Sequence, residues 1–321
     1  MASLGIKIGV SGACSSTTSP RKQILGSIAM LSALFVSDLH GRIERYQALF
    51  ATIEKEMPSF VFLGGDLLPF RDEDSFIQDC LVASFRNLRE ALRDRYPNVY
   101  LILGNDDPGA TVPSFVEGDS LGLWHYVHNR KVTMGQLIVY GYCCVPPTPF
   151  RLKDWERYDV SRYCEPGCIS PEEGVRSVSA EESDSKWGTI ERDLLALTES
   201  DDPRNAVFLF HAPPYDTCLD RAALDSKFVD HAPLDLHIGS IAIRRFIEAR
   251  QPLVSLHGHV HEAARLTGEW KTKIGRTVCL GAAHDGPELA LVRFDLSAPD
   301  HATRELLSFS YSASGVYGQD R

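Results

Sequence analysis

Several features are scarce in this sequence, and each absence narrows the class of protein. No apolar run reaches the roughly 20 residues that cross a bilayer, so we expect no membrane span. A basic excess is also missing, and the net charge of −10 argues against a broad electrostatic grip on nucleic-acid phosphates. No long polar linker divides the 321 residues, which favours one large domain over two small ones.

The eight cysteines lack the dense spacing of small disulfide-rich secreted domains. Free thiols in a reducing compartment are the simpler interpretation, and we expect a cytoplasmic protein. Cys164 and Cys168, in a stretch with Pro and Gly, offer the alternative of a disulfide or a small zinc site. The second ligand pair that such a zinc site needs is not evident.

The chain divides into a main domain and three flanking or inserted segments. Residues 1–29 begin with a stretch rich in Ser, Gly and Thr and are predicted to be a disordered extension. The apolar stretch at 24–36 imitates a secretory signal but runs directly into polar site residues, so we interpret its end as a core strand. Residues 30–300 form the predicted domain, with a polar insertion at about 146–200, and residues 301–321 are a predicted C-terminal tail.

Short apolar or β-branched runs recur along the chain and predict buried strands. They lie at 33–36, 60–63, 99–103, 137–140, 206–210, 253–256, 277–280 and 289–294. Amphipathic helical patterns lie between several of them, at 43–56, 75–95, 189–197 and 241–250. Strands that alternate with helices indicate an α/β fold.

Five of these strands are followed at once by residues that can bind metal. The segments are Ser37-Asp38-Leu39-His40-Gly41, Gly64-Gly65-Asp66, Gly104-Asn105-Asp106-Asp107, His211, and His257-Gly258-His259-Val260-His261. Ligand sites in α/β proteins form beyond the carboxyl ends of strands, so we expect the five loops to converge.

Each fragment alone also has an ordinary structural interpretation. An Asp-x-His pair is common, a Gly-Gly-Asp sequence is usually only a turn, and Asn105 beside Gly104 suits a turn or cap. A lone histidine such as His211 is more often a hydrogen-bonded core residue than a ligand. His259 and His261 are the most specific fragment, because paired imidazoles suit first-row transition metals.

Taken in order, these fragments resemble the calcineurin-like metallophosphoesterase family over about residues 33–296. The resemblance implies a four-layer α-β-β-α sandwich, in which helices flank two mixed β-sheets and the metal site lies at the strand C-terminal ends. It places Asp38, His40 and His261 on one ion and Asn105, His211 and His259 on the other, with Asp66 bridging both. Two divalent ions are implied, and the mixed nitrogen and oxygen donors suit Mn, Fe or Zn.

The function that follows is hydrolysis of a phosphodiester or phosphoanhydride in a small molecule, by attack of a hydroxide that bridges the two ions. One position departs from the family. The family motif commonly reads Gly-Asn-His, whereas this chain has Asp106 at the position of the histidine that protonates the leaving group. An ordinary aspartate is ionised at neutral pH, so Asp106 is either an acid with a raised pKa or unable to protonate the leaving group, and we favour the second.

Substrate contacts are expected from the insertion at about 146–200, for which a solvated surface loop is an equal alternative, and from three further residues. These are Arg42, His237 and Ser240, the last two near a predicted helix start whose free N–H groups would suit a phosphate. For Ser240 alone, the role of a plain helix cap is favoured. The expected partner is a small phosphorylated substrate, and the sequence predicts no oligomeric state. Two other functions remain open, a nuclease with the same fold and a non-catalytic interaction module.

Overall fold

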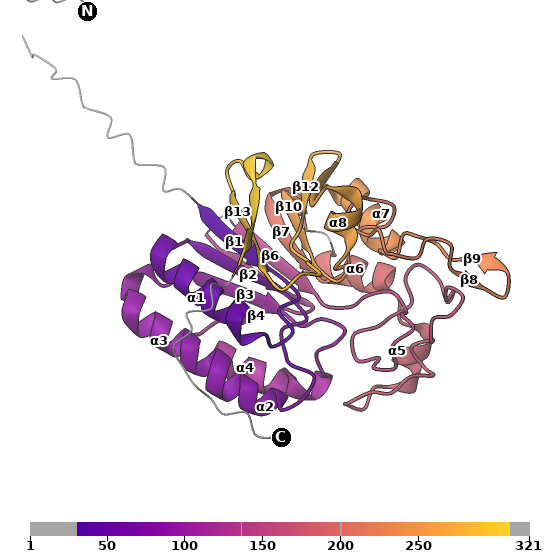
Figure 1. Ribbon diagram of the computed structural model, residues 1–321, viewed down its shortest axis with the longest axis horizontal. Coiled ribbons are helices and arrows are strands. Elements are labelled where there is room, and N and C mark those ends of the chain that lie inside the picture. Colours follow the sequence, from indigo (N-terminus) through magenta and orange to yellow (C-terminus); the bar gives the residue numbers. More distant parts are fainter. Residues whose placement is uncertain (1–30, 136, 200, 309–321) are drawn as a thin grey trace, which may run out of the picture.

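The computed structural model describes residues 31–135, 137–199 and 201–308, so the predicted extension at 1–29 lies outside the described part. Two six-stranded mixed sheets stack face to face, and helices cover their outer faces (Figure 1). The predicted α-β-β-α sandwich is therefore confirmed. Within the described part, no helix is long and apolar enough to cross a membrane.

The first sheet has the strand order β14-β13-β1-β2-β3-β4. Its strands are β1 (Ser32–Val36), β2 (Phe60–Gly64), β3 (Asn98–Ile102), β4 (His125–Tyr126), β13 (Leu289–Asp295) and β14 (Thr303–Leu307). Strands β1 to β4 run parallel, with Leu34 opposite Val61. Strand β13 runs antiparallel to β1, and β14 runs antiparallel to β13. The predicted C-terminal tail from 301 is wrong in its first part, because Thr303–Leu307 pairs with β13 as an edge strand.

The second sheet has the order β11-β12-β10-β7-β6-β5. Its strands are β5 (Arg130–Met134), β6 (Leu137–Tyr142), β7 (Ala206–Phe210), β10 (Val254–His257), β11 (Lys271–Ile274) and β12 (Thr277–Gly281). A separate hairpin pairs β8 (Phe228–Val229) with β9 (Ala232–Pro233). The four central strands β12, β10, β7 and β6 are parallel, so their carboxyl ends share one edge of the sheet.

The core forms between the two sheets, because the central strands are apolar on both faces. Every residue of β2 and β7 is buried, and β2 contacts β7 across the interface. Such continuous apolar strands are typical of parallel sheets that are covered on both sides. The sheet edges that carry the strand ends are thereby held at a fixed separation.

Helices form the two outer layers (Figure 1). They are α1 (Ile43–Glu56), α2 (Glu73–Phe76), α3 (Ala83–Leu92), α4 (Val112–Ser120), α5 (Glu182–Trp187), α6 (Ile190–Thr198), α7 (Ile241–Arg250) and α8 (Ala263–Thr267). Short 3-10 turns lie at Arg93–Arg95, Gly109–Thr111, Pro203–Asn205 and Pro299–His301. The helix predicted at 75–95 forms but is not uniform, since a π-helical segment at Ile77–Val82 joins α2 to α3.

The predicted insertion packs closely against the domain. The last part of the insertion is helix α6, which packs against α7 in the outer layer. The irregular part of the insertion is therefore 146–189, and it contains the short helix α5. Trp155 donates its indole N–H to the carbonyl of Asp107 over 2.7 Å, and Asp154 accepts the N–H of Gly109 over 2.7 Å. The insertion is thus fastened to the loop that follows β3.

A fully buried ion pair holds the insertion together. Lys153 and Glu156 are both inaccessible to solvent and form a salt bridge, and Lys153 Nζ also donates to the carbonyl of Thr148 over 2.9 Å. Glu156 accepts the backbone N–H of Thr148 over 2.8 Å and its hydroxyl over 2.5 Å. Burial raises the pKa of Glu156, against the opposing effect of Lys153 and Thr148.

We expect Lys153→Met to destabilise the fold by about 3–5 kcal/mol, because it leaves the Glu156 carboxylate buried without its counter-charge. Urea unfolding measures the loss, and limited proteolysis locates it to the segment 146–189. Lys273→Met is the matched control, because Lys273 pairs with Asp300 at the surface, where an ion pair contributes at most about 1 kcal/mol. Equal losses from the two variants would contradict the role assigned to the buried pair.

Candidate metal centre

The five predicted loops meet where the carboxyl ends of the parallel strands of both sheets lie. Asp38 and His40 follow β1, Asp66 follows β2, and Asn105 follows β3. From the second sheet, His211 follows β7, and His259 and His261 follow β10. Main-chain bonds lock the first two loops together, since Asp38 N donates to Gly65 O over 2.9 Å and His40 N to Asp66 O over 2.8 Å.

Four of these residues adopt the left-handed backbone conformation. Asp38, His40, Asp66 and His259 have φ values of 56°, 48°, 51° and 73°. This region costs non-glycine residues about 1–3 kcal/mol and is found where the surrounding structure imposes it, often at functional sites. The strained conformation turns each side chain out of the strand direction and toward the shared space.

One group of donor atoms is compact. Asp38, His40, Asp66 and His261 each offer one atom, and the four atoms lie within 4.8 Å of one another. His40 Nε2 lies 3.1 Å from His261 Nε2, which in turn lies 3.2 Å from Asp38 Oδ1. His40 Nε2 is 4.0 Å from Asp66 Oδ2.

A second group adjoins the first through Asp66. His211 Nε2 lies 3.2 Å from Asp66 Oδ2 and 3.1 Å from Asn105 Oδ1. The opposite ring nitrogen, His211 Nδ1, is 2.8 Å from the carbonyl of Gly64 and can only donate to it. Because Nδ1 is committed to that bond, Nε2 is the nitrogen that can face a metal, as in metal-binding histidines. The ring of His259 packs edge-on against His211, with 5.2 Å between centroids.

The electrostatics of the site favour added positive charge. Burial alone would raise the pKa values of Asp38 and Asp66, but the neighbouring histidines outweigh it and lower both. Burial likewise opposes the charged form of His211, yet Asp66 and Asp38 raise its pKa to about 10. Both buried carboxylates are therefore held ionised.

The donor set fits divalent metal ions. Ligands about 2.0–2.2 Å from one cation and at right angles to each other lie about 3 Å apart, which matches the spacings between the facing atoms. Two imidazole nitrogens at 3.1 Å, and an imidazole nitrogen facing two oxygens, are repelling lone pairs unless a proton or cation lies between them. The cluster can thus hold metal, and its nitrogen and oxygen donors suit transition metals.

Gly104 shows how tightly the loops are packed around the cluster. A Cβ at this position would lie 2.2 Å from Asp66 Oδ1 and 2.7 Å from His211 Cε1. Only glycine lets the β3 loop approach both side chains.

The two aspartates after Asn105 differ in environment. Asp106 is half exposed and lies 3.8 Å from His40 Nδ1, and partial burial together with the charge of Asp66 raises its pKa. Asp107 is buried and accepts the N–H groups of Leu67, Leu68 and Gly104. Burial and Asp66 raise its pKa to about 7, against the effect of these hydrogen bonds. Asp107 therefore braces the β2 loop against the β3 loop.

Two of the predicted substrate contacts do not reach the site. Ser240 is buried, and its hydroxyl donates to Asp159, which also accepts the N–H groups of Ile241 and Ala242. Ser240 is the N-cap of α7 and accepts the N–H of Ile243, so the first N–H groups of this helix are already bonded to Ser240 and Asp159. Arg42 is exposed, donates from its side chain to Gly286 O over 3.4 Å, and does not line the pocket above the cluster.

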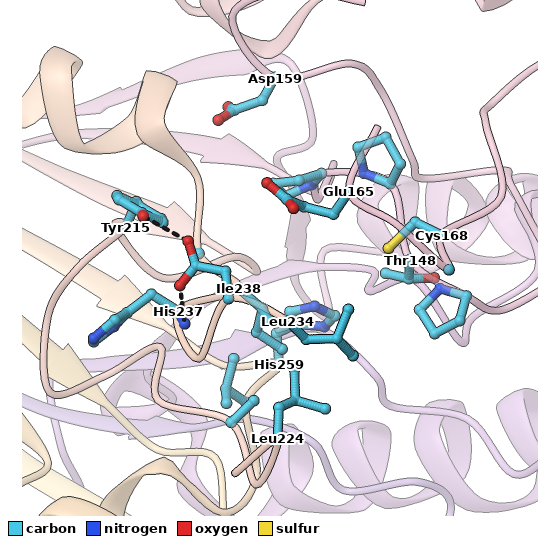
Figure 2. Close-up of a pocket in the computed structure, with 18 of the residues that line it drawn as sticks. Thr148, Asp159, Glu165, Cys168, Tyr215, Leu224, Leu234, His237, Ile238 and His259 are labelled. Carbon is cyan, nitrogen blue, oxygen red and sulfur yellow. Dashed lines mark hydrogen bonds between the residues drawn. The ribbon is translucent and has the colours of Figure 1, made fainter. Parts of the chain in front are cut away.

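His237 does line that pocket, but its ring is committed elsewhere. Its Nδ1 lies 2.8 Å from the buried Asp220, and its Nε2 lies 3.7 Å from Asp216. Figure 2 shows the His237 ring pointing away from His259. Its role in substrate binding stays a prediction.

Sequence reasoning missed several residues that shape the site. Asp159 and Trp155 lie in the insertion, and no local pattern marks either as a helix cap or as a support of the metal loops. Arg45 is buried in α1 and donates to the carbonyl of Asp38. A basic residue on the buried face of a predicted amphipathic helix was the one available signal.

A pocket of about 590 Å³ opens above the cluster (Figure 2). The loops that follow β1, β2, β3, β7 and β10 are called the metal loops below. They contribute to the pocket lining Asp66, Asn105, Asp106, His259 and His261. The insertion and the connection between β7 and α7 form its walls. Its size is that of a small-molecule site.

Comparison with known proteins agrees with this architecture. TT1561 of Thermus thermophilus is similar in structure, with a TM-score of 0.52 at 17% identity over 86% of this chain and 99% of that one. Another solved structure has a TM-score of 0.52 at 16% identity, over 87% of this chain and 100% of that one. A dimetal phosphatase from Danio rerio gives 0.46 at 11% identity, over 82% and 92%. No curated protein matches the chain.

The first two likenesses show a shared fold. The family assignment comes from the sequence itself, because the calcineurin-like phosphoesterase family model matches residues 31–263. The chain belongs to the calcineurin-like phosphoesterase family.

His257 supplies a titration test of the site's surroundings. Its Nδ1 lies 2.9 Å from the carbonyl of Ala212 and its Nε2 lies 2.8 Å from Ser255 Oγ, so neither nitrogen is free for a metal. Burial lowers the pKa of His257 to about 4, although the Ala212 carbonyl acts in the opposite direction. The neutral ring therefore stabilises the fold fully above the unfolded pKa, and protonation of the unfolded chain removes this contribution as the pH falls.

We expect the stability difference between the wild type and His257→Gln to shrink by about 1.4 kcal/mol per pH unit as the pH falls below about 6.5. Glutamine does not titrate, so only the wild type loses this contribution. Urea unfolding of both proteins at several pH values between about 5 and 7 measures the difference. A difference that stays constant over this range would mean that His257 is not held neutral in the fold.

Proposed function

We propose that this protein is a metal-dependent phosphoesterase that hydrolyses a phosphodiester or phosphoanhydride of a small molecule. Asp38, His40 and His261 would hold one divalent cation, and Asn105, His211 and His259 the other. Asp66 would contact both, because its Oδ2 faces His211 on one side and His40 on the other. Mn, Fe and Zn are the candidates that suit these donors.

The observation that carries the proposal is the convergence of Asp38, His40, Asp66 and His261 from three separate loops, with donor atoms within 4.8 Å. A protein that used this fold only to bind a partner would have no need to bury two carboxylates among histidines in strained backbone. The family to which the chain belongs supports phosphoric ester hydrolysis as the reaction.

The side chains divide the work of such a site. Bound divalent cations would polarise the phosphoryl oxygens and lower the pKa of water, so that hydroxide is available as the nucleophile near neutral pH. The chain itself keeps Asp38 and Asp66 ionised, fixes the His211 tautomer through Gly64 O, and excludes bulk water from the floor of the pocket. No serine or cysteine nucleophile is required.

Asp106 lines the pocket with Asp66, and its carboxylate lies 3.8 Å from His40 Nδ1. We propose that it does not protonate the leaving group, because cations bound at the neighbouring ligands would hold its carboxylate ionised. Leaving groups that are stable anions would then be preferred.

Asp66→Asn should abolish hydrolysis of bis(p-nitrophenyl) phosphate while the protein stays folded, because a neutral amide cannot balance two cations. His257→Gln is the matched control, since His257 lies next to the ligand loop but bonds only to protein atoms. The rate of hydrolysis by His257→Gln should fall by no more than about 10–100-fold. Metal content by elemental analysis and circular dichroism accompany the assay, and equal losses from the two variants would mean that the ligand set is misassigned.

Asp106→Asn should lower the rate only modestly for an aryl diester, whose leaving oxygen needs no proton. A loss of about 10²–10⁴-fold, largest for poor leaving groups, would instead identify Asp106 as a general acid. Asp106→His is the complementary change, and should raise alkyl monoester hydrolysis relative to diester hydrolysis. An unchanged ratio with metals bound would refute the idea that this position sets leaving-group preference.

A further inference from the structure

The pocket above the metal loops has an unusual charge pattern for a site that binds phosphate. Of the described residues that line it, none is Lys or Arg. Six are acidic, namely Asp66, Asp106, Asp159, Glu165, Asp235 and Glu262. Sites that recognise several phosphates use Arg or Lys to neutralise each added charge.

The acidic residues of the pocket walls bond to uncharged donors. Asp159 is satisfied by the end of α7, as described above. Asp235 accepts from the hydroxyl of Tyr215 and from the N–H of His237, and Glu262 accepts from Ala223 N over 2.9 Å. Glu165 is exposed and lies 3.4 Å from the hydroxyl of Tyr163. None of these donors carries a positive charge that would offset a carboxylate.

The rest of the wall is apolar. Figure 2 shows Leu224 and Leu234 beside His259, with Glu165 and Cys168 of the insertion on the facing side. Val160, Val229 and Val260 also line the pocket. Phe150 and Ile238, at 57% and 37% exposed, leave apolar surface open to solvent that a bound molecule would cover.

We infer that the substrate is a phosphodiester with a single anionic phosphate and an apolar arm that is neutral or carries a positive charge at its far end. This inference rests on the proposed function and selects the diester over the phosphoanhydride. Since no Lys or Arg is among the described residues that line the pocket, cations bound by the metal loops would supply its positive charge, and they suffice for one phosphate group. A second phosphate in the arm would meet the carboxylates of the wall without a counter-charge.

The test compares matched substrates with the full chain loaded with Mn²⁺. The substrate with a neutral arm is the p-nitrophenyl ester of thymidine 5′-phosphate. The substrate with an anionic arm is the same ester with an added 3′-phosphate, and the substrate with a cationic arm is p-nitrophenyl phosphocholine. We expect kcat/KM for the neutral and cationic arms to exceed that of the anionic arm at least tenfold, mainly through KM. ATP and diphosphate should be poorer still.

Variants that add a cation to the wall test the cause. Ile238→Lys should reduce the discrimination against the 3′-phosphate several-fold, and Phe150→Lys provides a second, more exposed position should the first variant not fold. Leu306→Lys is the control, since Leu306 is 44% exposed on the edge strand β14 and does not line the pocket. It should leave the ratio unchanged.

The outcomes separate the two proposals. Hydrolysis of none of the esters, and of neither ATP nor diphosphate, by metal-loaded protein would overturn the proposed function. Hydrolysis with equal or better kcat/KM for the anionic arm, or a preference for ATP or diphosphate, would leave the phosphoesterase intact and overturn the substrate class. A Leu306→Lys effect as large as that of Ile238→Lys would show that net charge, rather than the pocket, sets the preference.

Discussion

The structure depends most on one electrostatic constraint, the crowding of electron-pair donors at the meeting edge of the two sheets. Imidazole nitrogens face each other and face carboxylate or amide oxygens at 3.1–3.2 Å. Such facing atoms attract one another only when a proton or a cation lies between them. Against the effect of burial, Asp66 and Asp38 raise the pKa of His211 to about 10, which favours a proton between its ring and the facing oxygens.

Several hydrogen bonds in the surrounding fold hold the loops that carry these donor atoms in place. Asp38, His40, Asp66 and His259 hold a left-handed backbone, and the first three lie in the loops after β1 and β2 that main-chain bonds lock together. Asp107 joins the β2 loop to the β3 loop through three backbone N–H groups, and Trp155 joins the insertion to Asp107. The strain at the ligands is thus balanced by hydrogen bonds one layer away.

The candidate metal-binding residues and the walls of the pocket come from different parts of the chain. The metal loops come from strands that the buried core fixes in position, whereas the pocket walls come from the insertion and the connection between β7 and α7. Asp159 shows how closely the walls are tied to the fold, since it closes the α7 end that would otherwise attract a phosphate. In the proposed function the phosphate would therefore bind at the metal loops, between walls that are acidic and apolar.

The sequence by itself determined the α/β class, the central strands and the order of the polar residues that follow them, because apolar periodicity and strand-end motifs are local properties. It did not reveal β14, the π-helical segment after α2, or the occupation of the α7 end by Asp159. Each of these depends on a partner distant in the chain or on a packing irregularity. Whether Asp38, His40, Asp66 and His261 meet is likewise decided only by the stacking of two sheets, which brings together atoms more than 200 positions apart in sequence.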